Sequence, residues 1–97
     1  MLFHAVLFNF NDDVTEDKRK HILQLSYDLL TPIPGVLDFH AGRSIHADAE
    51  FEYAITMYFE GGQPALHDYR VHPDHERFRD VEFFPFLKSK LGLDYEA

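Results

Sequence analysis

The chain has 97 residues, which is enough for one domain with a modest hydrophobic core. Its 9 basic and 17 acidic residues give a net charge of −8, which argues against nucleic acid or an anionic membrane as a partner. The absence of cysteine excludes disulfides, thiolate metal sites and cysteine nucleophiles. The opening MLFHAVLFNF lacks a basic region and a cleavage motif, so we expect a cytoplasmic protein with a single domain over residues 1–97.

The N-terminal third predicts a strand followed by a helix. Residues 2–10 alternate two largely apolar sets of side chains, which is typical of a strand buried on both faces. Thr15 is a suitable N-cap, and the acidic residues that follow it favour the positive end of a helix. The TPIPG segment, residues 31–35, ends this helix because proline cannot continue it.

Two further strands are predicted in the middle of the chain. Residues 36–46 form the first of them, and Gly42 inside it indicates a bulge or bend. Residues 51–59 have the clearest alternation in the sequence, with aromatic and aliphatic side chains on one face. The second face of this strand is also partly apolar, as it is in the first strand.

The last third predicts a broken helix and a short final strand. Pro64 suits the first turn of a helix that stops near His72, because the residue before Pro73 is driven out of the helical region. A new helical segment starts at Pro73 and is interrupted by Pro85, and residues 92–97 form the last strand. The order β-α-β-β-α-β predicts a ferredoxin-like α+β sandwich with helices on one face of an antiparallel sheet.

This architecture leaves one apolar sheet face without a cover. Ala5, Leu7, Ala54 and Tyr58 are expected on the face opposite the helices. A second copy of the same sheet is the simplest cover, so we predict a homodimer through the open sheet face, with a barrel-like interior.

The segment HDYRVHPDHERF, residues 67–78, has the most distinctive chemistry. His67, His72 and His75 are side chains that suit zinc, but their spacing matches no known ligand motif and Pro73 breaks the helix between them. We therefore expect no metal and no other cofactor. The two remaining interpretations are a proton-transfer site and a structural corner that closes the core.

The proton-transfer interpretation predicts a small-molecule pocket. Tyr69 and His75 flank the helix break, and His4 shares the helix-covered face of the first strand, where a buried imidazole needs a hydrogen-bonding partner. A pocket with few polar groups among apolar ones suits a small hydrophobic or aromatic ligand. We expect these further residues to line it: Val6, Phe8, Tyr53, Ile55, Met57, Leu66 and His72.

Several motifs together resemble the stress-responsive dimeric A/B barrel domain (Dabb) family. They are FHAVLFNF at residues 3–10, IPGV at residues 33–36, the glycine of the second strand, and YRVHPDHERF at residues 69–78. The most specific piece is Y-x-x-H-P-x-H, and the resemblance spans nearly the whole chain. It implies a dimeric α+β barrel. The family includes stress-induced proteins and plant polyketide cyclases.

The same resemblance implies roles for individual residues. In cyclase-like members the last histidine of the motif acts as base and the tyrosine positions the substrate, and these roles fall to His75 and Tyr69. His4 matches a histidine of the same cavity, and His72 is expected to cap the helix break. Tyr53 stands where a cyclase pocket presents a histidine.

Two function classes follow. One is a non-catalytic binding or stress-protective module. The other is a cofactor-independent lyase or cyclase, or a cofactorless oxygenase. A solvent-connected cavity that holds His4, Tyr69 and His75 favours the enzyme, whereas a filled core there favours the module.

Overall fold

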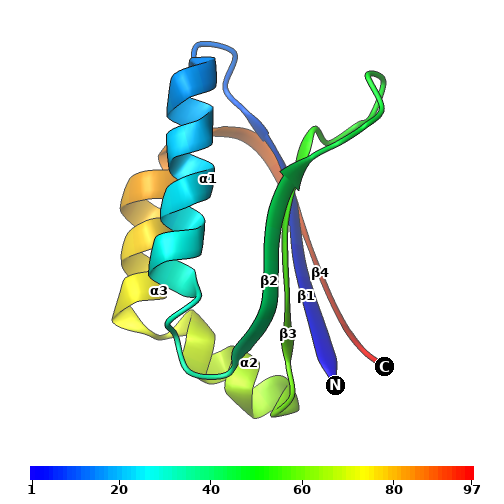
Figure 1. Ribbon diagram of the computed structural model, residues 1–97, viewed down its shortest axis with the longest axis vertical. Coiled ribbons are helices and arrows are strands. Elements are labelled where there is room, and N and C mark those ends of the chain that lie inside the picture. The colour runs from blue at the N-terminus through cyan, green and yellow to red at the C-terminus, as the bar shows by residue number, and fades with distance from the viewer.

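The computed structural model describes residues 1–97 as one layer of helices packed on one antiparallel sheet (Figure 1). The spatial order of the strands is β2-β3-β1-β4, and all neighbours are antiparallel. The elements in chain order are β1 (Leu2–Phe10), α1 (Glu16–Leu30), β2 (Val36–Arg43), β3 (Tyr53–Phe59), α2 (Gly62–Arg70), α3 (Pro73–Arg77), a π-helical turn (Phe78–Phe83), a 3-10 turn (Phe84–Phe86) and β4 (Leu87–Glu96). The predicted ferredoxin-like α+β architecture is confirmed.

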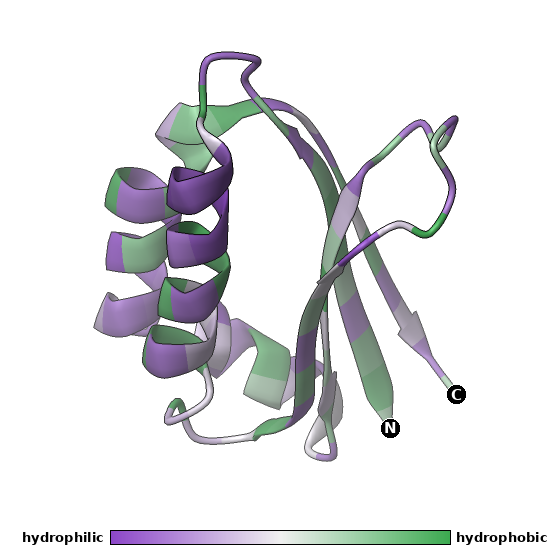
Figure 2. Cartoon of the chain, turned by 45° about the horizontal axis from the view of Figure 1, so that its top comes forward, coloured by the Kyte–Doolittle hydropathy of each residue, from purple (hydrophilic) through white to green (hydrophobic).

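The hydrophobic core lies between the helices and one face of the sheet. Alternate residues of β1 and β3 face the helices, and among them Phe8 and Phe59 are completely buried. Ile22 contributes from α1, whose outward side is hydrophilic in Figure 2. The side chains at every second position of the strands and those on one face of α1 thus pack together in one apolar layer.

The predicted start and end of the first helix are confirmed. Thr15 caps α1, because its hydroxyl oxygen accepts a hydrogen bond from the backbone N–H of Lys18 at 3.1 Å. Helix α1 ends at Leu30, immediately before the TPIPG segment. None of the helices combines the length and the apolar character that crossing a membrane requires.

The bulge predicted at Gly42 lies elsewhere. Gly42 pairs regularly with Ala54, and the register of β2 against β3 shifts between Leu37 and His40. Asp38 has a φ of +49° at that shift, a conformation that aspartate tolerates better than most residues. The glycine was therefore the wrong signal for the irregularity in this strand.

Three strand boundaries also differ from the prediction. Strand β2 ends at Arg43, and β3 begins at Tyr53. Strand β4 spans Leu87–Glu96 and pairs with all of β1. Lysine, serine and glycine interrupt its apolar pattern because it is an edge strand, so hydropathy indicated only its end.

The helix break at His72 and Pro73 is confirmed. Residue His72 has extended backbone angles and caps α3, because its Nδ1 accepts the backbone N–H of Asp74 at 3.1 Å. Pro73 takes the first helical position, where its missing N–H costs nothing. Helix α2 begins at Gly62, so Pro64 lies in its first turn as predicted. The break turns the chain so that Tyr69 and His75 approach each other.

Candidate functional site

A cavity of about 420 Å³ lies between the sheet and the broken helix. It opens to solvent along β4, whose residues are exposed at this position. Its wall is apolar in the middle and carries polar groups from five elements. The residues that line it are His4, Val6, Leu30, Ile55, Met57, Tyr69, Arg70, His75, Phe78, Arg79, Phe83, Phe84, Lys90, Leu91 and Gly92.

His75 stands in the first turn of α3 and is half-buried at the cavity wall. Its Nδ1–H donates a hydrogen bond to the backbone carbonyl of Arg70 at 3.0 Å. Burial lowers the pKa of His75 below its ordinary value of 6.5, although this hydrogen bond opposes the shift. The ring is therefore neutral at neutral pH, with the lone pair on Nε2, which is the state that a general base requires.

Tyr69, at the end of α2, lies between two histidines. Its ring centroid is 4.4 Å from that of His75 and 5.8 Å from that of His4. The side chain is almost fully buried, and burial raises the pKa of its phenol far above the ordinary value of 10. The phenol is therefore protonated at every physiological pH and can donate a hydrogen bond.

His4 is held by a chain of polar contacts across β1 and β4. Its Nδ1 lies in hydrogen-bond contact with a carboxylate oxygen of Asp94, the residue directly opposite it in the sheet. The other oxygen of Asp94 accepts from the guanidinium of Arg70 at 2.6 Å. Because a carboxylate can only accept, Nδ1 of His4 carries the proton and the ring orientation is set. Asp94 thus supplies the partner that this buried imidazole needs.

These three side chains form a compact polar set in an apolar surrounding. His75 can accept a proton, Tyr69 can donate a hydrogen bond, and His4 presents Nε2 in a fixed orientation. The carboxylate of Asp94 is balanced by Arg70, so the set carries no unpaired negative charge. This arrangement can move a proton to or from a bound carbonyl compound.

The structure distributes the other predicted pocket residues over several places. Val6, Ile55 and Met57 line the cavity. Phe8 and Tyr53 are core residues behind its wall, with their rings stacked at 5.6 Å. They form the helix-facing pair of β1 and β3 that follows the pair of Val6 and Ile55 along the strands.

Two further residues that we predicted for the pocket do not line this cavity. Leu66 lines a neighbouring hollow of about 430 Å³, which lies on the far side of the contact between Arg70 and Asp94. His72 is occupied in capping α3. No three histidine or carboxylate side chains, those of His67, His72 and His75 included, come together as a group that could hold a metal ion.

Sequence reasoning missed Asp94, Arg70 and Lys90, as well as the aromatic wall after α3. Asp94 could be found only from the register of β4, because the alternation of that strand is too weak to say which side chains face the helices. The aromatic residues lie in a π-helical turn and a 3-10 turn. The α-helical period therefore does not predict which of their side chains face the core. They are Phe78, Phe83 and Phe84.

Comparison with known proteins finds relatives that span almost the whole chain. Olivetolic acid cyclase from Cannabis sativa is 25% identical over 95 residues, which are 95% of this chain and 92% of that protein. The crystal structure of a Dabb family protein with a ferredoxin-like fold from Mesorhizobium loti is 27% identical, with a TM-score of 0.89 over 99% of this chain and 95% of that one.

A dimeric ferredoxin-like protein of unknown function from Thermobifida fusca has a TM-score of 0.86 at 23% identity. The match covers 99% of this chain and 90% of that one, and at this identity it shows the fold alone. The Dabb family, described as the stress responsive A/B barrel domain, matches residues 2–97. The chain therefore belongs to the stress responsive A/B barrel domain family.

Proposed function

We propose that this protein binds a small, mostly apolar carbonyl compound in the 420 Å³ cavity and transfers a proton on it, as a cofactor-independent cyclase or lyase does. The observation that carries the proposal is the state of His75. Its Nδ1–H is engaged by the Arg70 carbonyl and its pKa is lowered by burial, so a neutral Nε2 is available at the cavity wall.

The chemistry follows from the groups around the cavity. Nε2 of His75 takes a proton from the carbon next to a ligand carbonyl, and the electron pair moves onto the carbonyl oxygen to form an enolate. The hydroxyl of Tyr69 donates a hydrogen bond to that oxygen. In a cyclisation, the enolate carbon then attacks a second carbonyl of the same ligand. The new alkoxide takes the proton back from His75.

The remaining residues have supporting roles in this scheme. His4, oriented by Asp94 and Arg70, presents Nε2 as a hydrogen-bond acceptor for a hydroxyl group of the ligand. The aromatic and aliphatic wall excludes water from the enolate. The relative from Cannabis sativa is named as a cyclase, which agrees with a reaction of this class.

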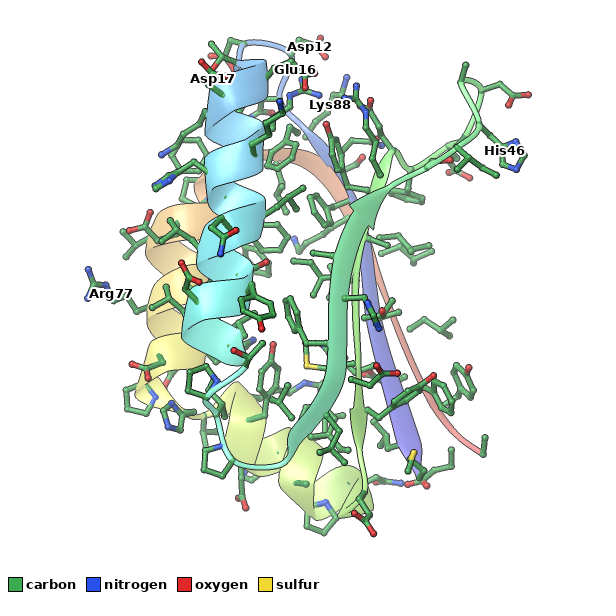
Figure 3. All side chains as sticks on the ribbon, viewed as in Figure 1. Asp12, Glu16, Asp17, His46, Arg77 and Lys88 are labelled. Atoms are coloured by element: carbon green, nitrogen blue, oxygen red, sulfur yellow. The ribbon has the colours of Figure 1, made fainter.

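A ligand-observed NMR and thermal-shift screen with aromatic and β-keto compounds tests the proposal. The wild type is compared with His75→Ala and with His46→Ala, a control on the exposed loop that Figure 3 shows far from the helices. We expect binding that raises the melting temperature, followed by turnover of a β-keto compound, both lost only in His75→Ala. Binding without turnover in the wild type would instead assign a non-catalytic binding module.

We also propose that the protein acts as a homodimer through its open sheet face. No helix covers this face (Figure 1). The ring of Phe3 stacks on Tyr95 at 4.6 Å and meets Tyr58 edge-on at 4.1 Å. Leu91 and Leu93 are each 52% exposed there, which is unusual for two leucines on one strand face. A second sheet would remove this apolar surface from water.

A further inference from the structure

The cavity wall contains one permanent cation that no carboxylate neutralises. Arg70 contacts Asp94 at 2.6 Å, and Arg79 contacts Asp80 at 2.7 Å. The ammonium of Lys90 has no such partner and instead lies 4.4 Å from the centre of the Phe84 ring. This cation–π contact keeps the charge at the cavity wall, where Phe84 is also exposed to the cavity.

Lys90 lies at the opposite end of the cavity from the proton-transfer groups. Along β4, the residues that face the helices are Lys90, Gly92 and Asp94, and their partners on β1 are Phe8, Val6 and His4. Four residues of strand separate the Cα atoms of Lys90 and Asp94 by about 13 Å. The cavity therefore has a proton-transfer end and a cationic end.

Gly92 keeps the floor between these ends open. A Cβ built at this position meets no atom within 4 Å, so the absence of a side chain leaves free space over Val6. The walls beside it are apolar, with Leu30, Phe78 and Phe83. An elongated ligand with an apolar middle fits a cavity of this kind.

We propose that the ligand is an elongated apolar carboxylate, with its carboxylate at Lys90 and its reacting carbonyl at the hydroxyl of Tyr69, beside His75. This inference rests on the proposed function and adds the chemical class of the ligand. A single ammonium among aromatic rings suits a monoanion. A phosphate dianion would call for the further donors of an arginine fork or a backbone nest, and both arginines here are already paired.

The test uses linear keto acids of increasing length, each with its carboxylate at the end remote from the ketone, and the matched neutral methyl esters. Dissociation constants are measured by ligand-observed NMR for the wild type, Lys90→Gln and Lys88→Gln. Lys88 is the control, because its ammonium contacts Asp12 at 2.7 Å near the start of α1 (Figure 3).

We expect the wild type to bind an acid of matching length roughly five- to tenfold more tightly than its ester. Lys90→Gln should abolish that preference, and Lys88→Gln should retain it. Equal affinity for acid and ester in the wild type, or a preference that survives in Lys90→Gln, overturns the inference and leaves the proposed function standing. Failure of both acids and esters to bind overturns both.

The variant Gly92→Val provides a second test of the inference. The added Cβ meets no atom within 4 Å and valine suits a strand, so we expect the variant to fold as the wild type does. It should weaken the binding of the long acids at least as strongly as Lys90→Gln and leave the lowered pKa of His75 unchanged in an NMR titration. Unchanged affinity for the long acids would show that the ligand does not pass over Gly92.

Discussion

The two faces of the sheet are both apolar, yet they differ in what they enclose. The space between the helix-covered face and the helices contains His4, His75 and Tyr69 in an apolar surrounding, and burial there shifts the pKa values of Tyr69 and His75. The open face has leucine and aromatic side chains such as Phe3 and Tyr95. Hydrophobicity alone therefore does not distinguish a binding site from an association surface. The titratable groups that are buried in an apolar cavity on the covered face make that distinction.

The largest effect is expected from a charge placed on the open face. Leu93→Asp puts a carboxylate next to Ala5, in the middle of the proposed contact between two sheets. Because each copy would bury this charge unpaired, we expect the dimer to weaken by at least about 100-fold. Sedimentation velocity over a concentration series measures the change.

The control for this variant is Val81→Asp, an exposed residue on the helical side of the molecule. It should leave the association unchanged. A Leu93→Asp protein that stays as dimeric as the wild type would show that the open face is not the interface between copies.

The second effect concerns the helix-covered face. His75→Asn keeps a side-chain N–H for the Arg70 carbonyl and removes the proton acceptor. We expect turnover of a β-keto compound to fall about 100-fold or more, while the free energy of unfolding changes by less than about 1 kcal/mol. Initial rates and urea unfolding measure the two quantities. A variant that loses stability and turnover together would assign His75 a structural role.

The third effect is smaller and isolates the positioning of His4. Asp94→Asn replaces the acceptor for Nδ1–H by an amide and breaks the ion pair with Arg70. We expect turnover to fall about tenfold, because the imidazole loses its fixed tautomer and orientation. The 15N chemical shifts of the ring report the tautomer directly. Retention of the Nδ1–H signal in the variant would contradict this role of Asp94.

The smallest effect is the contribution of His75, at the helix-covered face, to the pH dependence of stability. The pKa of His75 is lower in the folded chain than its ordinary value of 6.5, because burial disfavours the charged ring. Above that ordinary value the ring is neutral in both states and the full stability is present. As the pH falls from there toward the folded pKa, the unfolded chain binds the proton first and stability is lost.

Urea unfolding of the wild type and His75→Asn between about pH 5 and pH 8 tests this linkage. The wild type should lose more stability than the variant on the acid side. Parallel stability curves would show that His75 titrates at the same pH in the folded and unfolded chains.

Much of the fold could be predicted because its signals are local. Thr15 caps a helix, Pro73 breaks one, and the alternation of residues 51–59 assigns side chains to two faces. Each of these depends on neighbours within a few residues, so the element order and the ferredoxin-like class follow without any tertiary contact. The pairing of Tyr69 with His75 is nearly local as well, since only the helix break separates them.

The pairing of residues that are distant in sequence depends on the tertiary structure. Asp94 meets His4 across 90 positions of sequence, and Lys90 reaches the same cavity only through the register of β4 on β1. A shift of that register by one residue would turn Lys90, Gly92 and Asp94 to the opposite face. The amino-acid sequence alone shows which side chains with functional chemistry the chain has and which elements carry them. The antiparallel pairing of its two ends decided which of them share a cavity, because strand register depends on the whole sheet and leaves no local pattern.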